Sequence, residues 1–79
     1  MRLRNEAVED RSARPDGLTA REIEVLRMVA GGKSSREVGD DLVLSVRTVE
    51  RHITNIYAKI GAKGRADATS YALKHGIAE

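Results

Sequence analysis

Two helix-start signals stand close together in this sequence and limit the folds open to the chain. Thr19 is followed three residues later by Glu22. The same spacing recurs at Ser34 and Glu37. In such a capping box, each side chain accepts a hydrogen bond from the other residue's backbone N–H group at the start of a helix. The sequence therefore predicts two short helices in quick succession, joined by a glycine turn.

Apolar residues follow these signals at the three- and four-residue spacing of one helix face. Ser45 starts a third helix of the same kind, and Gly61 and Gly76 end the third and fourth helices. The predicted helices span about 19–30, 35–42, 45–60 and 65–75. Gly39, a poor helix residue, indicates a close approach of two backbones. The pattern predicts an all-α domain, a four-helix bundle whose second and third helices form a helix-turn-helix.

Residues 1–17 differ from the rest of the chain. Their charges alternate in sign, few of them are apolar, and Pro15-Asp16-Gly17 is a turn signal. A segment of this kind has too little apolar surface to pack into a core. We therefore expect a disordered or frayed tail over residues 1–17 and a folded domain over residues 18–79.

Composition excludes several classes of protein. The chain has 79 residues and no cysteine, so a disulfide scaffold and a Cys-ligated zinc site are excluded. The two histidines have no carboxylate partner at a catalytic spacing, so we expect no enzyme, no cofactor and no metal. No apolar run reaches the ~20 residues that span a bilayer. The N-terminus has no apolar signal-peptide core, and a soluble, intracellular protein is expected.

Most of the excess positive charge falls within residues 43–65. The whole chain carries 14 Lys and Arg against 12 Asp and Glu, whereas this segment holds five basic residues and one acidic residue. A local basic stripe is what phosphate binding requires. A solvated helix face would show the same pattern, so charge alone leaves both interpretations open.

The third predicted helix combines an apolar face with a polar face. The N-terminal half of the polar face carries Arg47, Glu50, Arg51 and Thr54. The major groove of DNA admits one α-helix, and in a helix-turn-helix the N-terminal part of the second helix contacts the bases. Arg can bind guanine O6 and N7, and Glu can accept a hydrogen bond from cytosine N4. The pattern therefore favours DNA binding through these four side chains.

Three stretches of the sequence together resemble a known family. They read LTAREIEVL, GGKSSREVGDDLVLS and RTVERHITNIYAKIGAKGRADA. In this order and spacing they are similar to the LuxR-type (LuxR/FixJ) DNA-binding domain of bacterial transcription regulators, in register from Leu18 to about Ala72. Glu50 departs from the family, in which Lys often follows the Thr-Val pair, so a known target sequence is not carried over.

The resemblance implies roles for individual residues. It makes the third helix the recognition helix, with the four residues named above facing bases, and it gives Glu22 a structural role inside the domain. Residues implied at or near phosphates are Lys33, Ser35, Thr48, His52, Asn55 and Lys59. Residues implied at a dimer contact on the fourth helix are Ala68, Tyr71, Ala72 and His75.

The resemblance also implies partners. These are double-stranded DNA, a second copy of the chain bound through the fourth helix, and RNA polymerase, all in the bacterial cytoplasm. The segment RADATSYALKHG is similar to the end of large, ATP-binding members of the family, which implies the C-terminal piece of a larger regulator.

Alternatives to this interpretation stay open from the sequence. A domain similar to region 4 of a sigma factor shares the helix-turn-helix, and a helical protein-interaction module is compatible with Glu50 and the acidic pair Asp40-Asp41. Tyr71 suits a dimer surface or the domain core equally. His52 suits a phosphate contact or the core, and Glu50 could form an ion pair with Arg47.

Overall fold

The computed structural model describes residues 15–78 of the chain. The elements in chain order are η1 (Pro15–Gly17), α2 (Ala20–Ala30), α3 (Ser35–Leu42), α4 (Val46–Ile60) and α5 (Arg65–Lys74). Four α-helices and no strand occur in this part of the chain, so the predicted all-α class is confirmed. The helix ends lie within one residue of the predicted ones. Residues 1–14 of the predicted tail lie outside the described residues.

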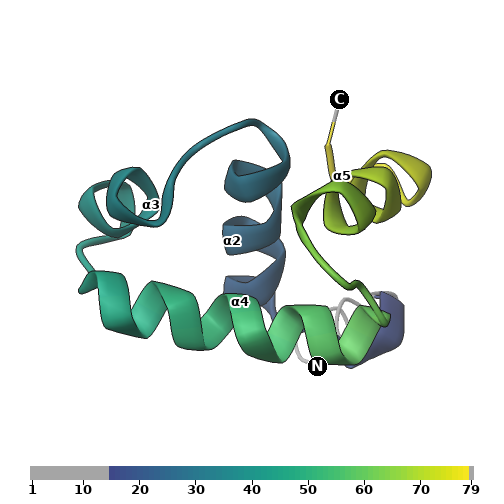
Figure 1. The fold of residues 1–79 in the computed structure, drawn as a ribbon, viewed down its shortest axis with the longest axis horizontal. Coiled ribbons are helices and arrows are strands. Elements are labelled where there is room, and N and C mark those ends of the chain that lie inside the picture. Colours follow the sequence, from purple (N-terminus) through teal and green to yellow (C-terminus); the bar gives the residue numbers. More distant parts are fainter. Residues whose placement is uncertain (1–14, 79) are drawn as a thin grey trace, which may run out of the picture.

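The helix α4 runs along one side of the molecule, and α2, α3 and α5 lie together on its other side (Figure 1). α3 packs against α4 to form the helix-turn-helix, and α2 packs against both α4 and α5. α3 lies by the N-terminal end of α4, whereas α5 lies toward its C-terminal end (Figure 1). This arrangement leaves the outer side of α4 uncovered by any other described helix.

Both predicted capping boxes are confirmed. The Thr19 hydroxyl accepts from the Glu22 N–H at 3.1 Å, and the Glu22 carboxylate accepts from the Thr19 N–H at 2.9 Å. Ser34 and Glu37 make the same reciprocal pair at 3.2 and 2.8 Å. These bonds satisfy N–H groups that an α-helix leaves unpaired at its first turn, so short-range sequence is enough to start α2 and α3 at these positions.

The core lies where the inward faces of the four α-helices meet. Its fully buried members come from η1–α2, α3, α4, α5 and the segment after α5: Leu18, Val25, Leu26, Val29, Val38, Val49, Ile56, Ala68, Ala72 and Ile77. The apolar face predicted for α4 is confirmed, because Val49 and Ile56 are buried and Ile53 and Ile60 pack against the core. Val25 was not predicted to lie in the core, because the apolar residues around it already formed a complete stripe at helical spacing.

The turn between α3 and α4 brings two backbones into close contact. The Leu44 N–H donates to the Gly39 carbonyl at 2.8 Å. A Cβ atom at Gly39 would lie 2.6 Å from the Leu44 carbonyl oxygen, closer than atoms can approach. The close approach predicted for Gly39 is therefore confirmed. Val43 ends α3 in the left-handed region, with φ 58°, which is unusual for a β-branched residue.

Arginine side chains close the C-terminal end of α2. The Arg65 guanidinium donates to the Val29 carbonyl at 2.8 Å and to the Lys33 carbonyl at 3.2 Å. Arg27 donates to the Ile77 carbonyl at 3.1 Å. The two bonds of Arg65 therefore fix α5 to the C-terminal end of α2 and to the turn that follows it. Within residues 15–78, no helix has the length and apolar character needed to cross a membrane.

Candidate nucleic-acid interface

The outer side of α4 carries the residues that were predicted to read bases. Arg47, Glu50, Arg51 and Thr54 are all exposed. Val49 and Ile56, on the opposite face of the same helix, are buried in the core. α4 therefore holds the four polar side chains outward on a helix whose other face is fixed by packing.

The charges of the two arginines on this face are available to a binding partner. In the part of the chain that the structure describes, neither Arg47 nor Arg51 forms an ion pair with a carboxylate. The ion pair between Arg47 and Glu50, which the sequence left open, is therefore absent there. A guanidinium that is already exposed and unpaired loses no internal partner when it binds a base or a phosphate. Glu50 lies among the arginines, so the face presents donors and an acceptor together.

The Thr54 side chain is bonded to its own helix. Its hydroxyl donates to the carbonyl oxygen of Glu50, one turn earlier, at 3.0 Å. A hydroxyl has one hydrogen to donate. Thr54 therefore has no hydroxyl hydrogen left for a partner, although its oxygen can still accept a hydrogen bond.

The start of α4 is capped by Ser45. The Ser45 hydroxyl accepts from the Thr48 N–H at 3.1 Å and donates to the Thr48 hydroxyl at 3.0 Å. The two hydroxyls share one hydrogen bond, so one hydroxyl hydrogen of the pair is left for another partner. A hydroxyl beside the positive end of a helix suits a phosphate oxygen. Thr48, which was expected to contact a phosphate, is half-buried.

Of the two residues expected to bind phosphate near α3, Lys33 is already engaged with a carboxylate. The Lys33 ammonium forms an ion pair with Asp41, and this hydrogen bond raises the lysine pKa. The Glu37 carboxylate occupies the first turn of α3, and Ser35 beside it is half-buried. The charge of Lys33 is therefore balanced by Asp41, and it is less available to a phosphate than the charge of an unpaired lysine.

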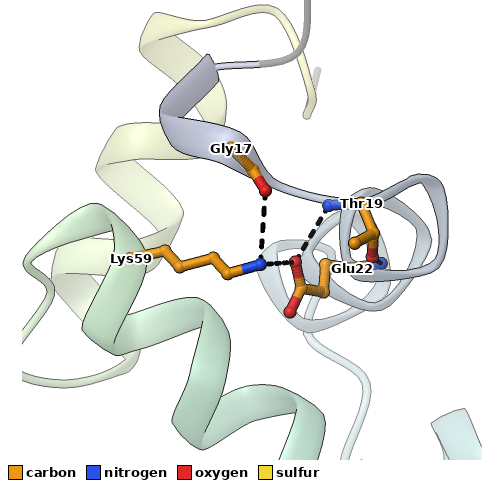
Figure 2. Close-up of polar contacts among 4 residues, drawn as sticks. All are labelled: Gly17, Thr19, Glu22 and Lys59. Atoms are coloured by element: carbon orange, nitrogen blue, oxygen red, sulfur yellow. Dashed lines mark hydrogen bonds and ion pairs between the residues drawn. The ribbon is translucent and has the colours of Figure 1, made fainter. Parts of the chain in front are cut away.

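The Lys59 side chain is bonded to other parts of the domain. Its ammonium donates to the Glu22 carboxylate at 2.8 Å and to the Gly17 carbonyl at 3.2 Å (Figure 2). The same carboxylate oxygen accepts from the Thr19 N–H, so Glu22 joins α4 to the start of α2, while the Lys59 ammonium reaches η1 through Gly17 (Figure 2). Lys59, expected at a phosphate, forms an ion pair within the domain, and 36% of its side chain stays exposed. The structural role expected for Glu22 is confirmed.

The surroundings of Glu22 favour its charged form. Burial of the carboxylate raises its pKa, but the hydrogen bonds from Lys59 and Thr19 and the charge of Lys59 outweigh burial. The net pKa of Glu22 is lower than its ordinary value of 4.5. Glu22 is therefore ionised at neutral pH and holds Lys59 in place.

The other two residues expected near phosphates lie on α4. Asn55 is exposed and His52 is half-buried. Asn55 follows Arg51 by one helical turn, so it can reach the edge of a surface centred on that arginine. His52 lies between the core and the surface.

The α5 residues expected at a dimer contact divide into two groups. Ala68 and Ala72 are fully buried, with 0% of their surface exposed, so they pack in the core. This placement corrects the expectation for both alanines, because a side chain without exposed surface cannot contact a second copy. Tyr71 is half-buried, and His75 is exposed with its ring 4.2 Å from the Tyr71 ring.

Tyr71 also fixes the segment before α2. Its hydroxyl donates to the Asp16 carboxylate at 2.5 Å. Burial raises the pKa of the Tyr71 phenol well above its ordinary 10.0, and the bond to Asp16 raises it further. With the Lys59 bond to Gly17, this contact orders η1, so fixed structure begins before the predicted boundary at residue 18.

Three of these contacts were not predicted from the sequence. The Lys59–Glu22, Arg65–Val29 and Tyr71–Asp16 bonds join residues 37, 36 and 55 positions apart. No local pattern signals such pairs. Lys59 and Arg65 lie in the stretch that resembles the family, which was the one available sign that these residues matter. The resemblance does not identify the groups that their side chains contact.

Comparison with known proteins agrees with this geometry. The family of bacterial regulatory proteins described as luxR matches residues 16–72, which is most of the chain. The chain is 42% identical over 62 residues to the transcriptional regulatory protein LiaR of Bacillus subtilis. It is 40% identical over 62 residues to the oxygen regulatory protein NreC of Staphylococcus aureus. Each alignment covers 78% of this chain but only 29% of the relative's length.

Proposed function

The chain belongs to the luxR family of bacterial regulatory proteins, and we propose that it binds double-stranded DNA as the output domain of a transcription regulator. α4 is the recognition helix and lies in the major groove. The observation that carries the proposal is the outer side of α4, where Arg47 and Arg51 are exposed and unpaired within the described chain. The buried apolar face of α4 holds this side outward.

The division of roles among the side chains follows from their surroundings. Arg47, Glu50, Arg51 and Thr54 contact bases, while Thr48 and Asn55 contact phosphates. Lys59 supports the fold through Glu22 instead of binding DNA. Lys33 binds phosphate only after it separates from Asp41, so it contributes less than an unpaired lysine would.

We propose a homodimer on a two-fold-related site. Leu73 is the one large apolar residue of α5 that is strongly exposed, at 53%, and His75 lies close to it in sequence. An exposed leucine at the end of a helix that packs on the core by its other face suits a contact with the same helix of a second copy. Half-sites would then lie about one helical turn of DNA apart. Light scattering of the wild type and of Leu73→Asp, with and without DNA, tests this: the variant should remain folded but lose the dimer.

For the whole protein, we propose RNA polymerase as a further partner and the cytoplasm as the location, since a regulator of bacterial transcription acts on both the chromosome and the polymerase. These proposals rest on the family alone.

The proposal is tested by selection of duplexes from a random pool, followed by anisotropy titration at two salt concentrations. We expect a two-fold-symmetric motif and an affinity that falls steeply with salt, because binding releases counterions from the DNA. Binding without a motif would mean that this part of the protein does not select sites by itself. No binding at low salt would contradict the proposal and favour a protein-interaction module.

A further inference from the structure

The base-reading face of α4 carries apolar groups as well as charges. Val46 is 42% exposed although it is a large apolar residue. Val46, Glu50 and Thr54 follow one another at four-residue intervals, which places them on one ridge along the helix. A branched side chain therefore lies at each end of this ridge, with the Glu50 carboxylate between them.

Thr54 has a methyl group free for a partner but no hydroxyl hydrogen left to donate. The hydroxyl donates to the Glu50 carbonyl at 3.0 Å, so its one hydrogen is used within the helix. The methyl group is the other branch of the same Cβ atom and has no such bond. Because Thr54 is exposed, this methyl group is available to a partner at the surface.

Thymine is the base that such a surface selects. It carries the C5-methyl group in the major groove, where the other base edges present hydrogen-bond donors and acceptors. We propose that Thr54 and Val46 read thymine through contact with this methyl group, and that the Thr54 hydroxyl donates no hydrogen bond to a base. This inference rests on the proposed function, since it requires α4 in the major groove.

The experiment replaces each thymine of the selected duplex in turn by uracil, which lacks only the methyl group. Burial of one methyl group predicts about a fourfold loss of wild-type affinity at each thymine that is read. Thr54→Ser removes the methyl group and keeps the hydroxyl, so it should bind one thymine duplex and its uracil counterpart equally. Thr54→Val keeps a methyl group and removes the hydroxyl, so it should retain the preference.

Val46→Ala tests the second contact in the same way. It should lose the preference for thymine over uracil at a different position from the one affected by Thr54→Ser. Thr69→Ser, on α5, makes the same chemical change away from the proposed interface and should leave every preference intact. Thermal melting of each variant verifies that it is folded.

The inference is overturned if the wild type binds every uracil duplex as tightly as its thymine parent, or if the selected motif contains no thymine. It is also overturned if Thr54→Val loses the preference while Thr54→Ser keeps it, because the hydroxyl would then read the base. In these cases the motif and the salt dependence still stand, so the proposed function survives. Absence of any DNA binding contradicts the proposed function and this inference together.

Discussion

Lys59 and Glu22 form an ion pair that joins the last turn of α4 to the first turn of α2, with 2.8 Å between the ammonium nitrogen and the carboxylate oxygen. The pair lies at the C-terminal end of α4, whereas Arg47 and Arg51 lie in its N-terminal half. One end of α4 is therefore fixed to the domain, and the other end presents the side chains proposed to read DNA.

Replacement of Lys59 by Met should lower stability rather than DNA contact. The variant keeps the apolar stem but leaves the buried Glu22 carboxylate without its cation, so we expect a loss of about 1–2 kcal/mol in the free energy of unfolding. Urea unfolding measures this loss. An unchanged stability together with a lower salt dependence of DNA binding would instead place Lys59 at a phosphate.

The same ion pair predicts a dependence of stability on pH. Because the folded state lowers the pKa of Glu22 below its ordinary 4.5, the stabilisation is present above that value and is lost as pH falls through the lower folded pKa. The difference in unfolding free energy between wild type and Lys59→Met should therefore be largest near neutral pH and shrink in acid. A difference that stays constant from pH 7 to pH 2 would contradict this account.

Arg51→Ala should weaken specific binding without affecting the fold. Loss of a two-bond contact to guanine predicts a cost of about 1–3 kcal/mol on the selected duplex and relaxed selection at one position. Anisotropy titration against the selected and a scrambled duplex measures both effects. Lys74→Ala, which removes the same charge from α5, is the control, and an equal loss in both variants would show that Arg51 contributes charge alone.

Asp41→Asn should strengthen binding to all duplexes. The change releases Lys33 from its ion pair, so one more cation can reach a phosphate and the salt slope should rise by about 1. Asp40→Asn makes the same charge change at the neighbouring exposed position, without a lysine to release. If both variants bind with the same slope, Lys33 lies away from the DNA.

Val43→Asn should stabilise the domain by about 0.5–1 kcal/mol. Val43 ends α3 with φ 58° and is 89% exposed, so a β-branched side chain is strained there without any packing in return. Asn tolerates this conformation better. Gly61 ends α4 at φ 72°, and Gly61→Ala should therefore change the melting temperature in the opposite direction. Destabilisation by Val43→Asn would mean that the valine makes a favourable contact.

Gly39→Val should destabilise the helix-turn-helix by about 1–3 kcal/mol, because a side chain there meets the Leu44 carbonyl at 2.6 Å from its first atom. Thermal melting measures the loss. A variant as stable as the wild type would show that α3 can move away from the turn at little cost.

Local signals in the sequence were enough to place every helix. The capping boxes at Thr19 and Ser34 and the glycine at the end of α4 act within a few residues of themselves, so no knowledge of the fold is needed to interpret them. The exposed polar face of α4 was predictable for the same reason, since the apolar stripe on one side assigns the other side to solvent.

The partners of charged residues could not be predicted in this way. Lys59 was expected at a phosphate from the resemblance to the family, and nothing near it in the sequence signals its bond to a buried carboxylate 37 residues earlier. The stripe of Ala68 and Ala72 had the spacing of a packed face, but spacing does not distinguish the core of one chain from a contact between two chains. The structure assigns both alanines to the core.

The measurement that tests the central claim most directly is methylation interference on the selected duplex. Methylation of guanine N7 blocks the major groove, and methylation of adenine N3 blocks the minor groove. With α4 in the major groove, we predict interference at guanine N7 within the motif, with the effect at one guanine lost in Arg51→Ala. Interference confined to adenine N3 would contradict the assignment of α4 as the recognition helix.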